Sequence, residues 1–412
     1  MIQDPKQKAS LRVVFLTVFI DLLGFGMVIP LLPIYAKQFT VDESGWVIGA
    51  LMASFSAMQF LFAPLWGRLS DSVGRRPVLM FGLAGSTVFY AVFGLATASE
   101  SLTWMFVSRI GAGVCGATIS TAQAYIADVT TLADRTKGMA LIGAAFGLGF
   151  TFGPLIGAAA LLGSSDVGLS PWPGYAAAIL SGGAFLLASV RLRESLHPGT
   201  APAEAKWFDF RALGDALAAP SIGVLLLALF VCVFSFANFE STMSLLLKQP
   251  EGGFAFEFKE VLLVFAFVGL VLTFVQGFLV RRVAGRLPEA VLATGGAIVS
   301  IVGFLLLAAA SGLSNFSLLI AALAIEVTGF AFMSPSIQSL ISRRTDPAKQ
   351  GRILGVGQSM SAMARIFGPL VGIRLFHVQA TLPFVAAAGL MLLGLILVTA
   401  GAWGGRDFEA AA

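Results

Sequence analysis

Long apolar segments dominate this chain and limit the kinds of fold that it can adopt. About 20 consecutive apolar residues are enough for a helix to cross the hydrocarbon core of a bilayer. The chain is 57% hydrophobic and only 12% charged, and its mean hydropathy is +0.90. We therefore predict an all-α polytopic membrane protein with twelve spans, at 11–37, 45–66, 78–98, 102–125, 138–162, 173–192, 219–247, 259–280, 289–311, 315–338, 353–376 and 381–403.

The basic residues are unequally divided between the two sides of these spans. An even number of spans places both termini on one side, and the loops and tails on that side carry 20 of the 26 Lys and Arg. Because Lys and Arg favour the cytoplasm, we expect both termini to be cytoplasmic, in a protein of the inner membrane. The first apolar run contains Asp21 and no convincing cleavage site, so it is expected to be a retained span. No nucleic-acid partner is expected from the net charge of +4.

An internal repeat divides the chain into two halves. Residues 121–157 match the stretch 215 positions later at nine positions in one ungapped register, ending on FGPL at 152–155 and at 367–370. We therefore predict a six-helix bundle at 1–193, a polar cytoplasmic linker at 194–215 and a second six-helix bundle at 216–412. Such repeats are typical of transporters whose site lies between the halves, near the middle of the membrane.

Four short motifs lie within or between these spans: DLLGFGMVIPLLP at 21–33, GRLSDSVGRRP at 67–77, RIGAG at 109–113 and GAAFGLGFTFGPLIG at 143–157. They resemble signatures of the major facilitator superfamily, and the first is closest to the tetracycline-efflux-like branch of its twelve-span drug:proton antiporters. The resemblance implies two six-helix bundles related by pseudo-two-fold symmetry around a central cavity. It also favours export over uptake, because the fifth-span signature is associated with antiporters.

The motif at 67–77 places charges between two apolar spans, and such charges are tolerated at a water-facing rim. Its two glycines are expected to allow a tight turn, and its aspartate can accept hydrogen bonds from the arginines or from a helix N-terminus. By resemblance, this loop would latch the cytoplasmic gate against the start of the eleventh span, around Gly351 and Arg352. Alternatively, the arginines only satisfy the preference for positive charge inside. The gate residues are Gly67, Asp71, Gly74, Arg75 and Arg76.

Two charges in the first half are expected near the middle of the membrane, where a charge costs about 3 kcal/mol even on the mildest insertion scale. Asp21 lies in the first span and Arg109 in the fourth. A carboxylate beside a cation that tunes its proton affinity is suited to proton coupling. The alternative is an ion pair that only holds the two spans together. Asp128 is expected at the cytoplasmic mouth, either as a gate residue or as a solvated helix end.

The second half contains three more charges within spans. Glu326 and Arg365 are expected to form a structural salt bridge, unless Arg365 attracts an anionic substrate group. Glu240, in the seventh span, has no obvious partner and is a second candidate for proton coupling or for binding a cationic substrate. The predicted substrate-cavity residues are Phe25, Gln123, Glu240, Glu326 and Arg365, although phenylalanines such as Phe25 are also suited to face lipid.

The fifth span contains a small-residue face. Gly149, Gly153 and Gly157 recur at every fourth position, and Pro154 is expected to bend the helix. Such a face allows close helix packing in a membrane. We interpret it either as a surface that slides between the halves or as close packing alone.

Other chemistry finds little support in the sequence. There is no His/Cys cluster with metal-ligand spacing and no phosphate-binding GxxxxGK[ST] loop, so no enzyme activity and no cofactor is expected. Cys115 and Cys232 both lie in apolar runs and indicate no disulfide. The favoured function is proton-coupled efflux of small amphiphilic compounds by a monomer whose partners are the substrate, protons and the lipid bilayer. The alternatives are an organic-anion or nutrient carrier (a symporter) and a membrane sensor without turnover.

Overall fold

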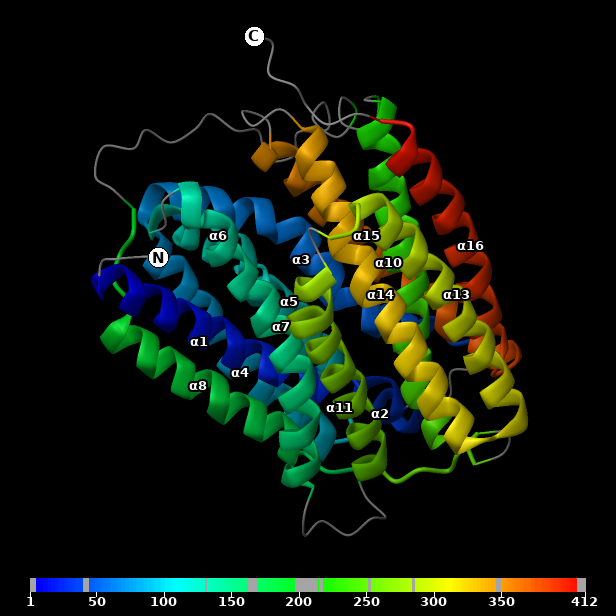
Figure 1. Cartoon of the computed structure of the whole chain (residues 1–412). Coiled ribbons are helices and arrows are strands. Elements are labelled where there is room, and N and C mark those ends of the chain that lie inside the picture. The colour runs from blue at the N-terminus through cyan, green and yellow to red at the C-terminus, as the bar shows by residue number, and fades with distance from the viewer. Residues whose placement is uncertain are drawn as a thin grey trace. The chain divides into compact units, whose positions relative to one another are not determined.

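The computed structural model describes residues 5–39, 44–129, 132–161, 169–196, 214, 218, 220–250, 253–283, 286–345 and 350–405. Its described elements are all helices, which confirms the predicted all-α fold class (Figure 1). They are α1 (Pro5–Val28), α2 (Leu32–Phe39), α3 (Trp46–Val73), α4 (Arg75–Ala98), α5 (Leu102–Gly116), α6 (Ile119–Val129), α7 (Leu132–Ala160), α8 (Trp172–Arg191), α10 (Pro220–Lys248), α11 (Phe258–Phe274), the π-helix η1 (Val275–Val280), α12 (Arg281–Val283), α13 (Glu289–Leu313), α14 (Phe316–Arg344), α15 (Gln350–Val378) and α16 (Leu382–Trp403).

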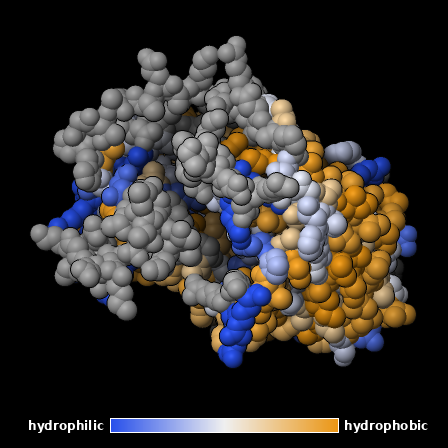
Figure 2. Space-filling view, turned by 45° about the horizontal axis from the view of Figure 1, so that its top comes forward, coloured by the Kyte–Doolittle hydropathy of each residue, from blue (hydrophilic) through white to orange (hydrophobic). Residues whose placement is uncertain are grey.

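Most of these helices have the length and composition of membrane spans. Among the described residues, ten are long and apolar enough to cross a bilayer, so the chain is an integral membrane protein. The predicted spans 138–162 and 353–376 correspond to α7 and α15, and α7 contributes a shorter apolar stretch, Ala144–Ala160. Hydrophobic residues cover a broad part of the described surface (Figure 2). α16, for example, exposes Leu392, Leu393, Ile396 and Trp403.

Two predicted spans are each divided into two helices. The first breaks between α1 and α2 at residues 29–31, because Pro30 lacks a backbone N–H and its ring clashes with the preceding turn. The fourth breaks between α5 and α6 at residues 117–118. There, Trp66 Nε1 donates to the Val114 carbonyl at 2.7 Å, and Gln59 Nε2 donates to the Gly116 carbonyl at 3.2 Å. These α3 side chains satisfy carbonyls that the end of α5 leaves without helical partners.

The chain forms two compact units. The N-terminal unit consists of Met1–Val41, Ser54–Phe208 and Glu257–Leu270, and the C-terminal unit consists of Asp42–Ala53, Asp209–Phe256 and Val271–Ala412. Most of the predicted linker lies outside the described residues, since residues 197–213 are not described. The division into two six-helix halves at 194–215 therefore stays a prediction.

Within the N-terminal unit, α1 packs closely against α7 and runs beside α8 (Figure 1). A Cβ atom added at Gly26 of α1 would lie 2.6 Å from the Gly149 carbonyl oxygen, and one added at Gly153 would lie 2.7 Å from the Leu23 carbonyl oxygen. The two backbones therefore touch where glycines face each other. Thus Gly149 and Gly153 of the small-residue face serve close packing inside this unit.

The remaining residues of that motif have different surroundings. A Cβ atom at Gly157 would lie 3.4 Å from both Met27 of α1 and Leu262 of α11, which is also part of the N-terminal unit. Pro154 is buried within α7, which continues through it to Ala160. A role of this face in sliding between the halves stays a prediction.

The C-terminal unit uses the repeated positions in the same way. Gly368 and Gly372 of α15 are the counterparts of Gly153 and Gly157, and they face Ala237 and Asn238 of α10. α13 and α14 also pack tightly, because a Cβ at Gly303 would lie 2.5 Å from the Glu326 Cα. Glycine contacts thus bring α15 close to α10, and α13 close to α14.

Candidate functional site

Asp21 lies on α1 and is partly buried within the N-terminal unit. The Ser181 hydroxyl of α8 donates a hydrogen bond to Asp21 Oδ1 at 3.5 Å, and Ser86 of α4 is a second hydrogen-bond partner. Both partners are neutral hydroxyl groups. Among the described residues, no ion pair therefore compensates the negative charge that Asp21 carries after it loses its proton.

Tyr90 of α4 lies within electrostatic reach of both Asp21 and Arg109. Its hydroxyl donates to the Asp21 backbone carbonyl at 3.4 Å. Its ring lies against Gly24, where an added Cβ would be 2.7 Å from Tyr90 Cε2. A glycine at position 24 therefore lets the tyrosine ring pack directly on the α1 backbone, one turn from Asp21.

Arg109 of α5 is 2% exposed, and its guanidinium faces aromatic rings. Its Cζ atom lies 4.4 Å from the centre of the Phe55 ring and 6.0 Å from that of Phe25. The Phe25 ring in turn packs on Phe55 and Phe150, with centroids 5.0 and 5.8 Å apart. Ring faces attract cations most strongly where water is excluded. Phe25 therefore helps to surround the guanidinium.

The ion pair between Asp21 and Arg109, which was the alternative to proton coupling, is not formed in the described part of the chain. Arg109 Nε is buried there without a hydrogen-bond acceptor. The expectation rested on depth in the membrane, which does not specify which way each side chain points around its helix. The two groups instead share Tyr90 as a neighbour, and Arg109 is surrounded by phenyl rings.

The C-terminal unit arranges its charges differently from the prediction. Glu240 of α10 and Arg365 of α15 are partly buried and interact electrostatically with each other. Glu326 of α14 is 0% exposed, and Glu240 is the charged group that acts on it. Neither Glu326 carboxyl oxygen has a hydrogen-bond partner among the described residues.

The expected salt bridge between Glu326 and Arg365 is therefore wrong for the described chain, where Glu240 is the acid that interacts electrostatically with Arg365. The physical reason is the close approach of α10 and α15 at Gly368 and Gly372, which brings the helix of Glu240 beside that of Arg365. The complete burial of Glu326 also differs from the expectation that it lines a cavity.

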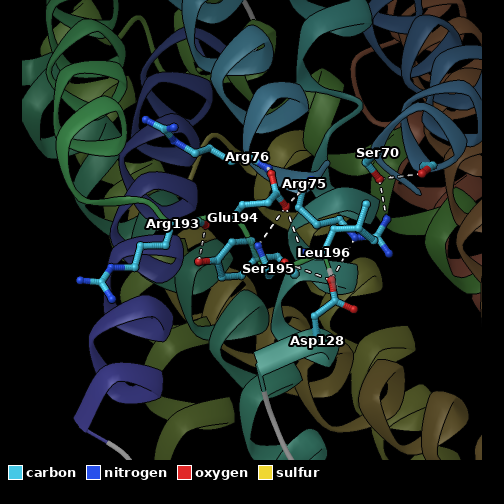
Figure 3. A network of polar contacts seen from close by, with 10 residues as sticks. Ser70, Arg75, Arg76, Asp128, Arg193, Glu194, Ser195 and Leu196 are labelled. Carbon is cyan, nitrogen blue, oxygen red and sulfur yellow. Dashed lines mark hydrogen bonds and ion pairs between the residues drawn. The ribbon is translucent and has the colours of Figure 1, made fainter. Parts of the chain in front are cut away.

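A second polar cluster surrounds the start of α4 (Figure 3). Arg75 Nε donates to Asp128 Oδ2 at 3.1 Å, forming an ion pair between α4 and α6, and Arg75 Nη1 donates to the Ser70 hydroxyl at 2.7 Å. Ser195 Oγ donates to the same Asp128 oxygen at 3.0 Å. Arg76 Nη2 donates to the Ser189 carbonyl at 2.8 Å, near the end of α8.

Glu194 binds the backbone of this cluster, a role that the sequence analysis missed (Figure 3). Its carboxylate accepts the N–H groups of Arg75 at 2.8 Å and Arg76 at 3.1 Å. It also accepts the N–H groups of Ser195 at 2.9 Å and Leu196 at 3.0 Å. The carboxylate caps the N-terminus of α4, where free N–H groups and the helix dipole favour an anion.

The predicted tight turn at 67–77 is shorter than expected. α3 continues through Gly67 to Val73, and the chain reverses at Gly74, whose φ is 106°. That backbone conformation favours glycine, and a Cβ at Gly74 would also collide with the Glu194 carboxylate. The side chains of Asp71 and Arg352 and the surroundings of Gly351 are not described, so a latch between these residues stays a prediction.

Removing the Glu194 carboxylate is expected to destabilise the start of α4 in the N-terminal unit. Burial alone would raise the pKa of Glu194, but the four backbone N–H donors outweigh it and lower the pKa below its ordinary value of 4.5. The stabilisation is therefore present above about pH 4.5 and is lost as the pH falls through the lowered pKa. Glu194→Ala should cost about 1 kcal/mol at neutral pH.

Thermal unfolding in detergent, followed with a thiol-reactive dye, would measure this effect, because Cys115 and Cys232 are both free and buried. The matched control is Glu100→Ala, because Glu100 is exposed beyond the other end of α4. Equal melting temperatures for wild type and Glu194→Ala at neutral pH would contradict the capping role.

Comparison with known proteins places this arrangement in a family. The family model described as Major Facilitator Superfamily matches residues 14–369. The chain belongs to the Major Facilitator Superfamily. It is therefore a membrane transporter and not an enzyme, and it resembles the tetracycline-efflux-like branch, as the first-span motif predicted.

Two relatives match this superfamily member over nearly its whole length. The class C tetracycline resistance protein of Escherichia coli is 31% identical over 408 residues, covering 97% of this chain and 98% of the relative. The crystal structure of the human organic anion transporter MFSD10 (TETRAN) superposes with a TM-score of 0.73 at 28% identity, covering 96% of this chain and 100% of that one. A D-xylose-proton symporter superposes with the same TM-score at 15% identity and shows the fold alone.

Proposed function

We propose that this superfamily member is a proton-coupled antiporter that exports small amphiphilic compounds by alternating access. The observation that carries the proposal is Asp21, a carboxylate in the first span whose hydrogen-bond partners, Ser86 and Ser181, are neutral. Such a group can take up or release a proton without breaking an ion pair. The tetracycline resistance relatives support export as the direction.

In this proposal, Asp21 loads and releases the proton, and Arg109 tunes that exchange from nearby through Tyr90. Phe25, Gln123, Glu240 and Arg365 contribute to the substrate path, which is supported by their partial exposure. The protein works as a monomer in the inner membrane, with both termini in the cytoplasm.

Arg75, Arg76 and Asp71 would contribute to the cytoplasmic gate in this scheme. The ion pair of Arg75 with Asp128 and the capping of α4 by Glu194 support it, because they hold the start of α4 in place. A firmly held helix end suits a gate that must close reproducibly.

The proposal is tested first with a growth panel and then with purified protein. An efflux-deficient bacterium expressing the full chain is exposed to tetracycline, lipophilic cations and organic anions. The compound with the greatest protection is then loaded into proteoliposomes that contain a pH-sensitive dye. Protons moving opposite to the compound support antiport, whereas co-directional movement indicates a symporter. If neither protons nor any of the tested compounds cross the membrane, the protein is a sensor.

A second candidate, an organic-anion carrier, is favoured by the surroundings of Arg109. Its guanidinium has neither an ion-pair partner nor an acceptor for Nε among the described residues, and a buried cation of this kind suits an anionic substrate group. The likeness to the human organic anion transporter agrees with this chemistry.

If the substrate is anionic, Arg109→Gln should weaken its binding by about tenfold or more, because a charge-assisted hydrogen bond contributes about 1.5–3 kcal/mol. The measurement is the Michaelis constant for the best anionic compound of the panel. Arg191→Gln serves as the control, because Arg191 is exposed at the end of α8. An unchanged Michaelis constant in Arg109→Gln would exclude this role.

A further inference from the structure

Glu326 lies in the middle of α14, and its carboxyl group is entirely removed from solvent. Among the described residues, no donor reaches either of its oxygens. On the side of α13, Glu326 meets Gly303, and the Ser300 hydroxyl donates to its backbone carbonyl at 3.4 Å. An ionised carboxylate without donors is costly to bury, so this group needs a proton or a positive partner.

The packing of α10 and α14 explains why Glu240 is the charged group that acts on Glu326. The two helices run antiparallel (Figure 1), and they meet where the rings of Phe236 and Phe330 stack with centroids 4.0 Å apart. Glu240 lies four residues beyond Phe236, and Glu326 lies four residues before Phe330. Residues four apart share a helix face. Each acid therefore lies one helical turn from the stacked rings, and both lie on the same side of the rings. The two acids are on the helix surfaces by which α10 and α14 face each other.

Arg365 supplies positive charge to the same place from α15, through its interaction with Glu240. The other packed helices add no charge at this level. α16 has no charged residue, and the one charged residue of α13 is Glu289, at its first position, where it pairs with Arg343. Two carboxylates and one guanidinium leave one negative charge uncompensated when all three are ionised.

We propose that Glu240 and Glu326, with Arg365 as their counter-charge, form a second proton site that holds one proton between the two carboxyl groups. Two carboxyl groups that share a site do not both ionise easily, and they titrate as a pair. One added proton brings the three groups to neutrality. Glu240 is partly exposed and Glu326 is buried, which suits Glu240 to exchange the proton and Glu326 to store it.

The use of this site in transport rests on the proposed antiport, but proton binding itself is measured without a substrate. Infrared difference spectra of the full chain in proteoliposomes, recorded between acidic and alkaline buffers, detect the carbonyl stretch of a protonated carboxyl group. We expect the wild type to show one such band, which disappears when the pH is raised. The same band should be absent from the spectra of Glu326→Gln. Asp21→Asn is the matched control and should retain that band.

The neighbours should move the titration midpoint of that band in opposite directions. Glu240→Gln removes a negative charge and should shift the midpoint to lower pH, whereas Arg365→Gln removes a positive charge and should shift it to higher pH. These two variants also carry the test if Glu326→Gln fails to fold. A band that survives Glu326→Gln, or a midpoint unmoved in both neighbour variants, would overturn the second site. If the band behaves as expected but no proton-driven flux occurs, the antiport proposal fails and the proton site stands.

Discussion

Asp21→Asn should abolish uphill transport of the substrate while leaving substrate exchange intact. Asparagine has the shape of the protonated acid and can still accept the Ser181 hydrogen bond, but it cannot release a proton. A gradient of one pH unit is worth about 1.4 kcal/mol per proton, which sustains about tenfold substrate accumulation for each proton exchanged. The variant should therefore lose this accumulation and equilibrate to a concentration ratio of one.

Proteoliposomes with an imposed pH gradient measure the accumulation ratio, and exchange of labelled for unlabelled compound without a gradient measures turnover alone. Asp21→Glu is the control, because it keeps an ionisable group and should retain part of the accumulation. If Asp21→Asn accumulates substrate like the wild type, Asp21 is not the coupling group. If labelled exchange is also lost, the variant has failed in folding or binding and not in coupling.

Gly26→Val should prevent the N-terminal unit from packing. The first added carbon would already lie 2.6 Å from the Gly149 carbonyl oxygen and within 3.5 Å of the Gly153 Cα. Neither neighbour is a side chain that can turn away. Overpacking of this kind costs about 1–3 kcal/mol for small additions, and a branched side chain adds to that cost. Against a total stability of about 5–15 kcal/mol, we expect a strong loss of folded protein.

The yield of monodisperse protein after extraction, together with its melting temperature, measures this effect. Gly183→Val is the matched control, because Gly183 lies on α8 of the same unit and an added Cβ meets nothing within 4 Å. Normal yield and melting temperature in Gly26→Val would show that α1 and α7 can separate at little cost.

Several features of the fold were predictable because they depend on local composition. Span positions agree with the helices to within a few residues over much of the chain, since each apolar run must satisfy its own backbone within the membrane. The breaks were harder to predict. Pro30 marked the division between α1 and α2, but nothing at residues 117–118 announced the division that Gln59 and Trp66 support from another helix.

The sequence allowed us to predict which residues belong to the candidate site, but not which residues they contact. Asp21, Arg109, Glu240, Glu326 and Arg365 were recognisable because charges are rare within apolar spans. Their partners were not. Glu194 lies 119 positions from Arg75 in sequence, and it lies three residues beyond the end of α8, where no periodic pattern indicates a role. Ser86 and Ser181 are small polar residues of a kind that is common in membrane helices.

Sequence by itself determined that this protein is a helical membrane transporter of the Major Facilitator Superfamily, because hydropathy, charge sorting and short motifs are properties of local stretches. Tertiary structure alone decided which charges meet. Glycine contacts at Gly26, Gly153 and Gly368 set how closely the helices approach and how they are rotated against one another. The direction in which each side chain points from its helix then decided its surroundings. Arg109 lies among phenyl rings, Arg365 interacts with Glu240, and Glu326 lies in an interior where no described donor reaches its carboxyl oxygens.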